Sequence, residues 1–136
     1  MAVSLAEIRE RSGEVFLEGC PTRVVLDHIM SKWGVLVLLA LTDGTHRWGE
    51  LRREVQGISE KMLASTLRTL EADGLVARTS YPKVPPRVEY ALTDLGRELM
   101  DRMLPLVEWV AAHAGAMVDA PVGLPPVSSA PAPARR

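Results

Sequence analysis

The order of short patterns between residues 47 and 96 constrains the fold of this chain more than any other feature of its sequence. Two amphipathic helical patterns come first, separated by a turn that contains Gly57. A strand, a proline-rich tip, a second strand and a new helix start then follow directly. This order predicts a helix-turn-helix joined to a β-hairpin, and its tight spacing leaves little room for a cleft lined with catalytic groups.

The second helical pattern has two distinct faces. Ser59 stands where it can cap the helix N-terminus, and the helix dipole favours Glu60 in the first turn. Leucines recur at intervals of four and three residues and predict a buried stripe, made of Leu63, Leu67 and Leu70. At about 100° per residue, the opposite face carries Lys61, Ala64, Ser65 and Arg68.

A hairpin is predicted after Gly74, which stands where helices commonly end on a left-handed residue. Residues 75–81 and 87–92 alternate as two strands. The intervening PKVPP (82–86) cannot continue a ladder, because proline lacks the amide donor. It predicts a stiff tip that carries Lys83, with Arg87 at its base.

These patterns together favour the recognition of duplex DNA. Cations and hydroxyl groups can hold phosphates, and an arginine can read the edge of a guanine. Taken alone, Lys61 and Arg68 would be the solvated face of an amphipathic helix, but a basic tip directly after that helix reverses the preference. We therefore predict DNA contacts by Ser59, Lys61, Ser65, Arg68, Lys83 and Arg87. The predicted fold class is α+β, mainly α: a winged helix-turn-helix with a two-stranded wing, flanked by N- and C-terminal dimerisation helices.

Several motifs resemble the HxlR-type winged-helix regulators of bacteria and archaea. They are Cys20-Pro21, Lys32-Trp33, the GELRREVQGISEKML run, LRTLEADGLV, the YPKVPPRVEYALTDLG run and Trp109, and they cover roughly residues 18 to 112. The resemblance implies a dimeric, cytoplasmic transcription factor with its recognition helix at 59–73 and its wing at 80–88. Some members sense oxidants or electrophiles through a cysteine near the start of the first helix, where Cys20 stands. This chain departs from the pattern at Trp48, where Phe is usual, and at Ser31, where Gly is frequent.

Composition agrees with one domain that is not a nonspecific, strongly basic nucleic-acid binder. The chain has 136 residues, 47% hydrophobic content and a net charge of −1. Between residues 47 and 90 there are eight Lys or Arg and six Asp or Glu, a local surplus of two cations. The run VLVLLAL (35–41) is too short to span a bilayer. Without a secretory pattern and with one cysteine, a cytoplasmic location is expected, with no membrane partner.

Three regions are expected along the chain: an N-terminal arm or helix (1–15), the winged helix-turn-helix with its dimerisation helices (16–118), and a disordered Pro/Ala-rich tail (119–136). Thr22 is predicted to cap a helix through Lys32, with Val25, Leu26, Ile29 and Trp33 buried. Thr93 is predicted to cap the last helix, with a kink or break at Pro105. The apolar surface of the end segments is broader than one core stripe, which favours a homodimer interface at Leu5, Ile8, Leu106, Trp109 and Val110.

Cys20 has two interpretations. A lone cysteine is often a small buried hydrophobic residue, whereas a nearby helix N-terminus and Arg23 would favour a reactive thiolate. His28, His46 and His113 are dispersed, so neither a metal site nor a cofactor is predicted, and no enzyme activity is expected. Two alternatives to a redox-responsive DNA-binding regulator stay open. One is a winged-helix module that binds another protein, and the other is a regulator of unknown small-molecule effector in which Cys20 is structural.

Overall fold

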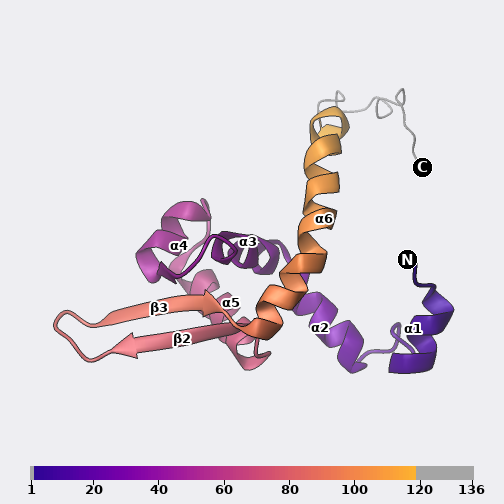
Figure 1. The fold of residues 1–136 in the computed structure, drawn as a ribbon, viewed down its shortest axis with the longest axis horizontal. Coiled ribbons are helices and arrows are strands. Elements are labelled where there is room, and N and C mark those ends of the chain that lie inside the picture. The colour runs from indigo at the N-terminus through magenta and orange to yellow at the C-terminus, as the bar shows by residue number, and fades with distance from the viewer. Residues whose placement is uncertain (1, 119–136) are drawn as a thin grey trace. The chain divides into compact units, whose positions relative to one another are not determined.

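The computed structural model describes residues 2–118, and Figure 1 shows the course of the chain. Within this range the elements, in order, are α1 (Leu5–Ser12), α2 (Pro21–Ile29), α3 (Lys32–Leu41), β1 (His46–Arg47), α4 (Trp48–Glu54), α5 (Glu60–Ala72), β2 (Val76–Tyr81), β3 (Arg87–Leu92) and α6 (Asp94–Val118). The chain divides into two compact units, with the boundary between Met100 and Asp101 inside α6. The tail expected at 119–136 lies outside the described residues.

The region from residue 20 to 41 differs from the sequence prediction. The prediction that Thr22 caps this helix is wrong. Cys20 occupies the N-cap position of α2, because the fixed φ of Pro21 suits the first position of a helix. The helix ends at Ile29, and a second one begins at Lys32, where Ser31 Oγ accepts the Gly34 N–H at 3.1 Å. A Cβ at Gly34 would lie 2.3 Å from the His28 carbonyl oxygen, so this sharp joint requires glycine.

Burial in α2 was also overestimated. Ile29 is buried, but Val25 and Leu26 are each 41% exposed. The helix packs on α3 and α5 with one face, and periodicity alone does not say whether another element covers the other face. Among the described residues, no single helix is long and apolar enough to span a membrane. Only α2 and α3 taken together, with a bend of 68° between them, have the required length and apolar content.

The helix-turn-helix is formed by α4 and α5, as predicted. Glu50 Oε1 accepts the Arg47 N–H at 2.7 Å and so caps the start of α4. This hydrogen bond lowers the pKa of Glu50 below its ordinary value of 4.5, with smaller contributions from the nearby charges of His46, Arg47 and Arg53 and opposition from desolvation. Gly57, at φ +90°, makes the turn to α5.

The sheet has one more strand than the predicted hairpin. Its order is β1-β3-β2, and both pairings are antiparallel. The hairpin strands agree with the prediction to within one residue, and Val76 pairs with Leu92 at one end and Tyr81 with Arg87 at the other. The two-residue β1 was missed, because two residues carry no alternation and only pairing with β3 defines them.

The core of the first unit lies where α3 and α5 pack together and against the sheet. The predicted leucine stripe of α5 is confirmed, with Leu63 and Leu70 fully buried and Leu67 2% exposed. Apolar side chains from α3, α4 and the first strand of the hairpin join them: Val37, Leu38, Leu41, Leu51 and Val76. Burial of each such side chain contributes about 1.5–3 kcal/mol, which fixes α5 firmly through one face.

The helix α6 begins with the predicted cap. Thr93 Oγ1 accepts the Gly96 N–H at 3.0 Å and donates to the Gly74 carbonyl at 2.6 Å. Gly96 allows close packing, because a Cβ there would lie 2.2 Å from the Leu75 carbonyl oxygen. A kink or break was predicted at Pro105; no break occurs there, since α6 continues through Pro105 to Val118.

Candidate nucleic-acid interface

The recognition-helix candidate α5 exposes a polar face. Ser59 caps it as predicted, with Oγ accepting the Met62 N–H at 3.0 Å. Lys61, Ser65 and Arg68 are all exposed, while the leucines between them are buried. Because the leucine face is buried in the core, these three residues lie together on the exposed face of the helix.

An ion pair joins the two helices of the helix-turn-helix at the start of α5. Arg52 Nη1 lies 3.1 Å from Glu60 Oε2, and both side chains are exposed. An exposed pair of this kind contributes only ~0–1 kcal/mol to stability. Its electrostatic effect matters more, because Arg52 offsets the acidic side chain that stands next to Lys61.

The C-terminal end of α5 is tied to α2. Asp73, the C-cap residue, accepts a hydrogen bond from the ring N–H of His28, whose Nδ1 lies 2.8 Å from Asp73 Oδ2. Both side chains are partly buried. A hollow of about 180 Å³ lies beside this pair, and Asp27, Ser65 and Thr69 are among the residues that line it. The pair therefore fixes the end of the helix that follows Arg68.

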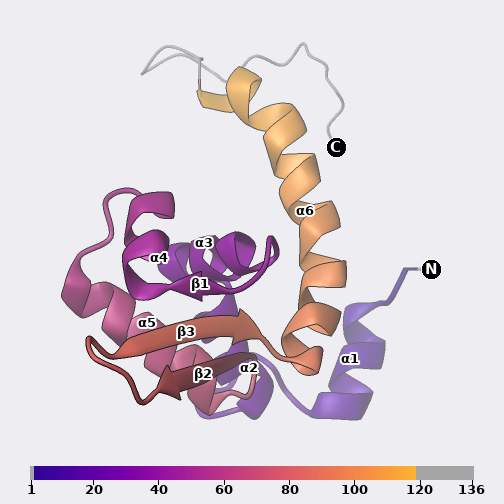
Figure 2. The same cartoon turned by 60° about the vertical axis from the view of Figure 1, so that its left-hand side comes forward.

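The wing is made of β2, β3 and the tip between them, and α5 runs behind it in Figure 2. Tyr81, Arg87 and Glu89 form a cluster on one face of the hairpin. The Tyr81 hydroxyl donates to Glu89 Oε1 at 3.1 Å, and the Arg87 guanidinium lies 5.6 Å from the centre of the Tyr81 ring. Arg87 Nε lies 3.0 Å from Glu89 Oε2, an ion pair by distance, although its N–H is not aligned for a hydrogen bond. The charge of Arg87 is therefore partly neutralised.

Lys83 at the wing tip is exposed and has no side-chain hydrogen bond or ion pair within residues 2–118. Its backbone N–H donates to the Tyr81 carbonyl at 2.9 Å, which makes a tight turn. The adjacent Val84 is 98% exposed. The tip thus presents a lysine on a proline-bounded loop, as the sequence indicated.

Sequence reasoning missed Arg78 as a candidate. Arg78 pairs with Tyr90 across the hairpin, so the two side chains share the face of the sheet that includes Val76 and packs on the helices. Arg78 is exposed and has no ion pair with the described residues. The signal was present in the alternation of β2, which puts Arg78 on the same face as Val76 and opposite to Thr79. Of the two arginines in the hairpin strands β2 and β3, Arg78 is the less neutralised.

Cys20 is a half-buried free thiol at the N-cap of α2. Its Sγ lies 3.9 Å from the Ser12 carbonyl oxygen, a weak hydrogen bond. The guanidinium of Arg23 turns to the Phe16 carbonyl, to which Nη1 donates at 2.5 Å. This contact connects Cys20 to the last residue of α1. Within residues 2–118, no three His, Cys, Asp or Glu side chains come close enough together to hold a metal ion.

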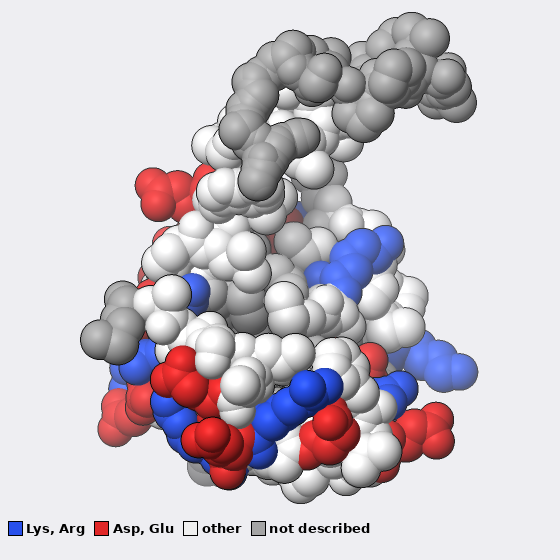
Figure 3. Space-filling view, turned by 90° about the vertical axis from the view of Figure 1, so that its right-hand side faces the viewer, with Lys and Arg blue, Asp and Glu red and all other residues white. Residues whose placement is uncertain are grey.

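The residues predicted for a dimer interface are surface residues in a single chain. Leu5, Leu106 and Val110 are each 45% exposed, Trp109 is 55% exposed, and Ile8 is half-buried. On α2 and at its C-cap, the apolar side chains of Val24, Val25, Leu26 and Met30 are also exposed. On the face that Figure 3 shows, acidic and basic side chains are interspersed around uncharged surface. That face therefore lacks a continuous basic stripe.

A helix-turn-helix whose second helix carries exposed cations, followed directly by a two-stranded wing, defines a winged helix-turn-helix transcriptional regulator. The chain belongs to the HxlR-like helix-turn-helix family, whose model matches residues 28–117.

Two kinds of relative agree with this assignment. The HTH-type transcriptional regulator YtfH of Escherichia coli is 50% identical over 108 residues, which are 79% of this chain and 85% of that protein. The solved structure of ytfH from Salmonella typhimurium has a TM-score of 0.73 at 50% identity, and the match covers 78% of this chain and 95% of that one. The oxidised redox regulator HypR has a TM-score of 0.63 at 43% identity, covering 68% and 96%.

Proposed function

We propose that this protein binds specific sites in double-stranded DNA as a homodimer and regulates transcription in the cytoplasm. The observation that carries the proposal is the two-faced α5, with Leu63, Leu67 and Leu70 in the core and Lys61, Ser65 and Arg68 exposed. A helix anchored on one side can enter the major groove with the other.

The exposed residues divide into two roles. Arg68 is assigned to a base edge, since arginine makes bidentate contacts with guanine. Lys61, Ser65 and, at the wing, Lys83 and Arg87 are assigned to phosphates, together with Arg78. Ser59 accepts a hydrogen bond as the helix cap and retains a hydroxyl proton that can be donated to a phosphate.

A mobility-shift or anisotropy titration on the promoter nearest the gene tests these assignments. Arg68→Ala should weaken binding to the specific site by ~1–3 kcal/mol and affect random DNA much less. Arg11→Ala, which removes an exposed arginine at the end of α1, is the matched control and should leave both affinities unchanged. Equal specific-site affinity in Arg68→Ala and wild type would show that this face of α5 does not read bases.

The wing is tested by salt dependence. Lys83→Ala should weaken specific and random DNA alike, and it should flatten the plot of log affinity against log salt by about one unit. An unchanged slope would remove Lys83 from the interface. A folded dimer with no salt-dependent affinity for any DNA would instead favour the protein-interaction alternative.

The homodimer is supported by the exposed apolar residues of α1 and α6, because monomeric proteins rarely leave large apolar patches uncovered. Two recognition helices related by a two-fold axis should read half-sites about 34 Å apart, or a multiple of this distance, in a pseudo-palindrome. Sedimentation should show a dimer at micromolar concentration. Trp109→Ala should shift the equilibrium toward monomer, and a stable wild-type monomer with full DNA affinity would refute the proposed assembly.

A redox response through Cys20 is the proposed signal, supported by the free thiol at a helix N-terminus and by the likeness to a protein described as a redox regulator. With one cysteine per chain, diamide would join two thiols, either from two protomers or from one protomer and a small thiol. Two S–H bonds are lost, one S–S bond forms, and diamide takes the two hydrogens. Diamide should change DNA affinity in the wild type and not in Cys20→Ser. The same response in both proteins would leave Cys20 a packing residue.

A further inference from the structure

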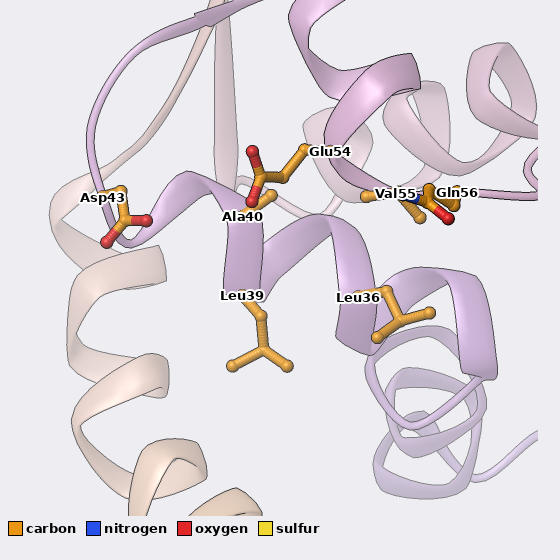
Figure 4. A pocket seen from close by; sticks show the side chains of 7 residues that line it. All are labelled: Leu36, Leu39, Ala40, Asp43, Glu54, Val55 and Gln56. Carbon is orange, nitrogen blue, oxygen red and sulfur yellow. The ribbon is translucent and has the colours of Figure 1, made fainter.

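An open groove lies on the first unit between α3 and the segment that follows α4 (Figure 4). Its volume is about 400 Å³, toward the lower end of the ~300–1,000 Å³ that small-molecule sites occupy. The lining combines apolar side chains with two carboxylates and one amide: Leu36, Leu39, Ala40, Asp43, Glu54, Val55 and Gln56.

The apolar part of the groove comes from one face of α3. Leu36, Leu39 and Ala40 recur at intervals of three and four, so they share a helix face. The opposite face, with Val37 and Leu38, is fully buried in the core. Leu36 is nevertheless 38% exposed. The helix is therefore apolar on its solvent side too, beyond what the core of this unit uses.

The charged part of the groove is purely acidic. Asp43 follows the end of α3 and Glu54 ends α4, and Figure 4 shows both at the end of the groove away from Leu36, with the Glu54 side chain extending toward the side where Asp43 lies. Both are exposed, and within residues 2–118 neither carboxylate has a hydrogen bond or an ion pair. No lysine, arginine or histidine lines the groove. An anionic ligand is disfavoured by this arrangement, whereas a cation would face two uncompensated charges.

We propose that this groove is an effector site for a small amphipathic organic cation. An aromatic or branched aliphatic group would cover Leu36 and Leu39, and a quaternary or protonated amine would lie between Asp43 and Glu54. At the other end of the groove, Gln56 offers an amide to a hydrogen-bonding group of the ligand.

The groove is connected to the recognition helix through the turn of the helix-turn-helix. Val55 and Gln56 begin the segment that leads through the buried Ile58 to the cap residue Ser59. A ligand that displaces Val55, which is only 5% exposed, would move the start of α5. The regulatory part of this inference rests on the proposed DNA-binding function, whereas the binding part does not.

The binding part is tested with benzyltrimethylammonium chloride and its uncharged isostere neopentylbenzene. Each is titrated into the ¹⁵N-labelled full-length protein while the backbone amides of residues 36–56 are followed by NMR. The cation should shift these amides and bind more tightly than the isostere. Asp43→Asn combined with Glu54→Gln should weaken cation binding about three- to tenfold, as expected for two exposed charge pairs. The matched control, Glu10→Gln with Glu18→Gln, removes two exposed carboxylates elsewhere and should have no effect.

Equal affinity for the cation and its isostere, or equal cation affinity in the two double variants, would overturn the assignment of the ligand class. Absence of shifts at residues 36–56 would overturn the site. Shifts there that depend on protein concentration without ligand would also overturn it, and they would favour a second copy of the chain as the occupant of the groove. The regulatory part is tested by DNA affinity with and without the cation. Failure of the ligand-free protein to bind DNA would count against the proposed function alone, whereas DNA affinity that the bound cation leaves unchanged would overturn the effector role.

Discussion

Gly96 and Gly115, the two glycines of α6, have very different surroundings, and together they test how closely the start of α6 packs against the residue before β2. Gly96 lies in the first turn, where an added Cβ would come within 2.2 Å of the Leu75 carbonyl oxygen and 3.2 Å of Leu92 Cδ2. Gly115 lies near the other end, where an added Cβ would meet nothing within 4 Å. The same substitution, Gly→Ala, should therefore change stability in opposite directions at the two positions.

The magnitudes follow from two opposing effects. Alanine is favoured over glycine in a helix by about 1 kcal/mol, and this gain applies at both sites. At Gly96 the backbone oxygen must move by close to 1 Å to reach an ordinary contact, and overpacking of this kind costs about 1–3 kcal/mol or more. We expect Gly115→Ala to raise the unfolding free energy by roughly 0.5–1 kcal/mol and Gly96→Ala to lower it by roughly 1–2 kcal/mol.

Thermal and urea unfolding followed by circular dichroism measures both effects. Each kcal/mol corresponds to roughly 3–6 °C in Tm for a domain of this size. Both variants should be compared with the wild type at one protein concentration, because association makes Tm concentration-dependent. A Gly96→Ala protein as stable as the wild type would refute the close approach between α6 and the start of β2.

Three further perturbations test the caps and the ion pair near the helix-turn-helix. Ser59→Ala should lower the unfolding free energy by about 1 kcal/mol through the lost N-cap, measured by urea unfolding, and Ser59→Asp should largely restore it. The hydrogen bond from the Arg47 N–H lowers the pKa of Glu50 below its ordinary value of 4.5. The ionised Glu50 carboxylate therefore stabilises the fold at pH values above 4.5, and this stabilisation is lost as the pH falls below 4.5 and through the lowered pKa. Urea unfolding of Glu50→Gln should accordingly show a weaker loss of stability in that acidic range, and identical pH profiles would contradict the cap. A double-mutant cycle of His28→Ala and Asp73→Ala should give a coupling of about 0.5–3 kcal/mol, and additive effects would show that the pair contributes nothing.

Local patterns in the sequence predicted the parts of the fold that local physics determines. The leucine spacing of α5, the cap at Ser59 and the proline-bounded wing tip each depend on a few neighbouring residues, and each was found as predicted. The strand β1 was missed because its definition depends on Tyr90 and Glu89, more than forty residues away along the chain. Val25 and Leu26 were placed inside because periodicity identifies an apolar face without saying what covers it.

The candidate sites show the same division. Lys61, Ser65 and Arg68 could be found from helical periodicity, and their exposure agrees with it. Arg87 was treated as a free cation, although Glu89 stands two residues later on the same strand face and forms the ion pair that the structure contains. The α3 groove was invisible, because VLVLLAL is apolar all round and gives no indication that Leu36 and Leu39 face solvent.

The ion pair between Arg87 and Glu89 at the base of the wing affects the number of ions that a salt titration of DNA binding would report as released. In the proposed DNA complex, a phosphate that binds the Arg87 guanidinium would release a condensed cation from the duplex, but it would also separate Arg87 from Glu89. The released carboxylate then stays beside the phosphates and attracts a cation of its own. Net ion release per wing is therefore smaller than the number of its basic residues, and Glu89→Gln should steepen the salt dependence while it strengthens DNA binding at low salt.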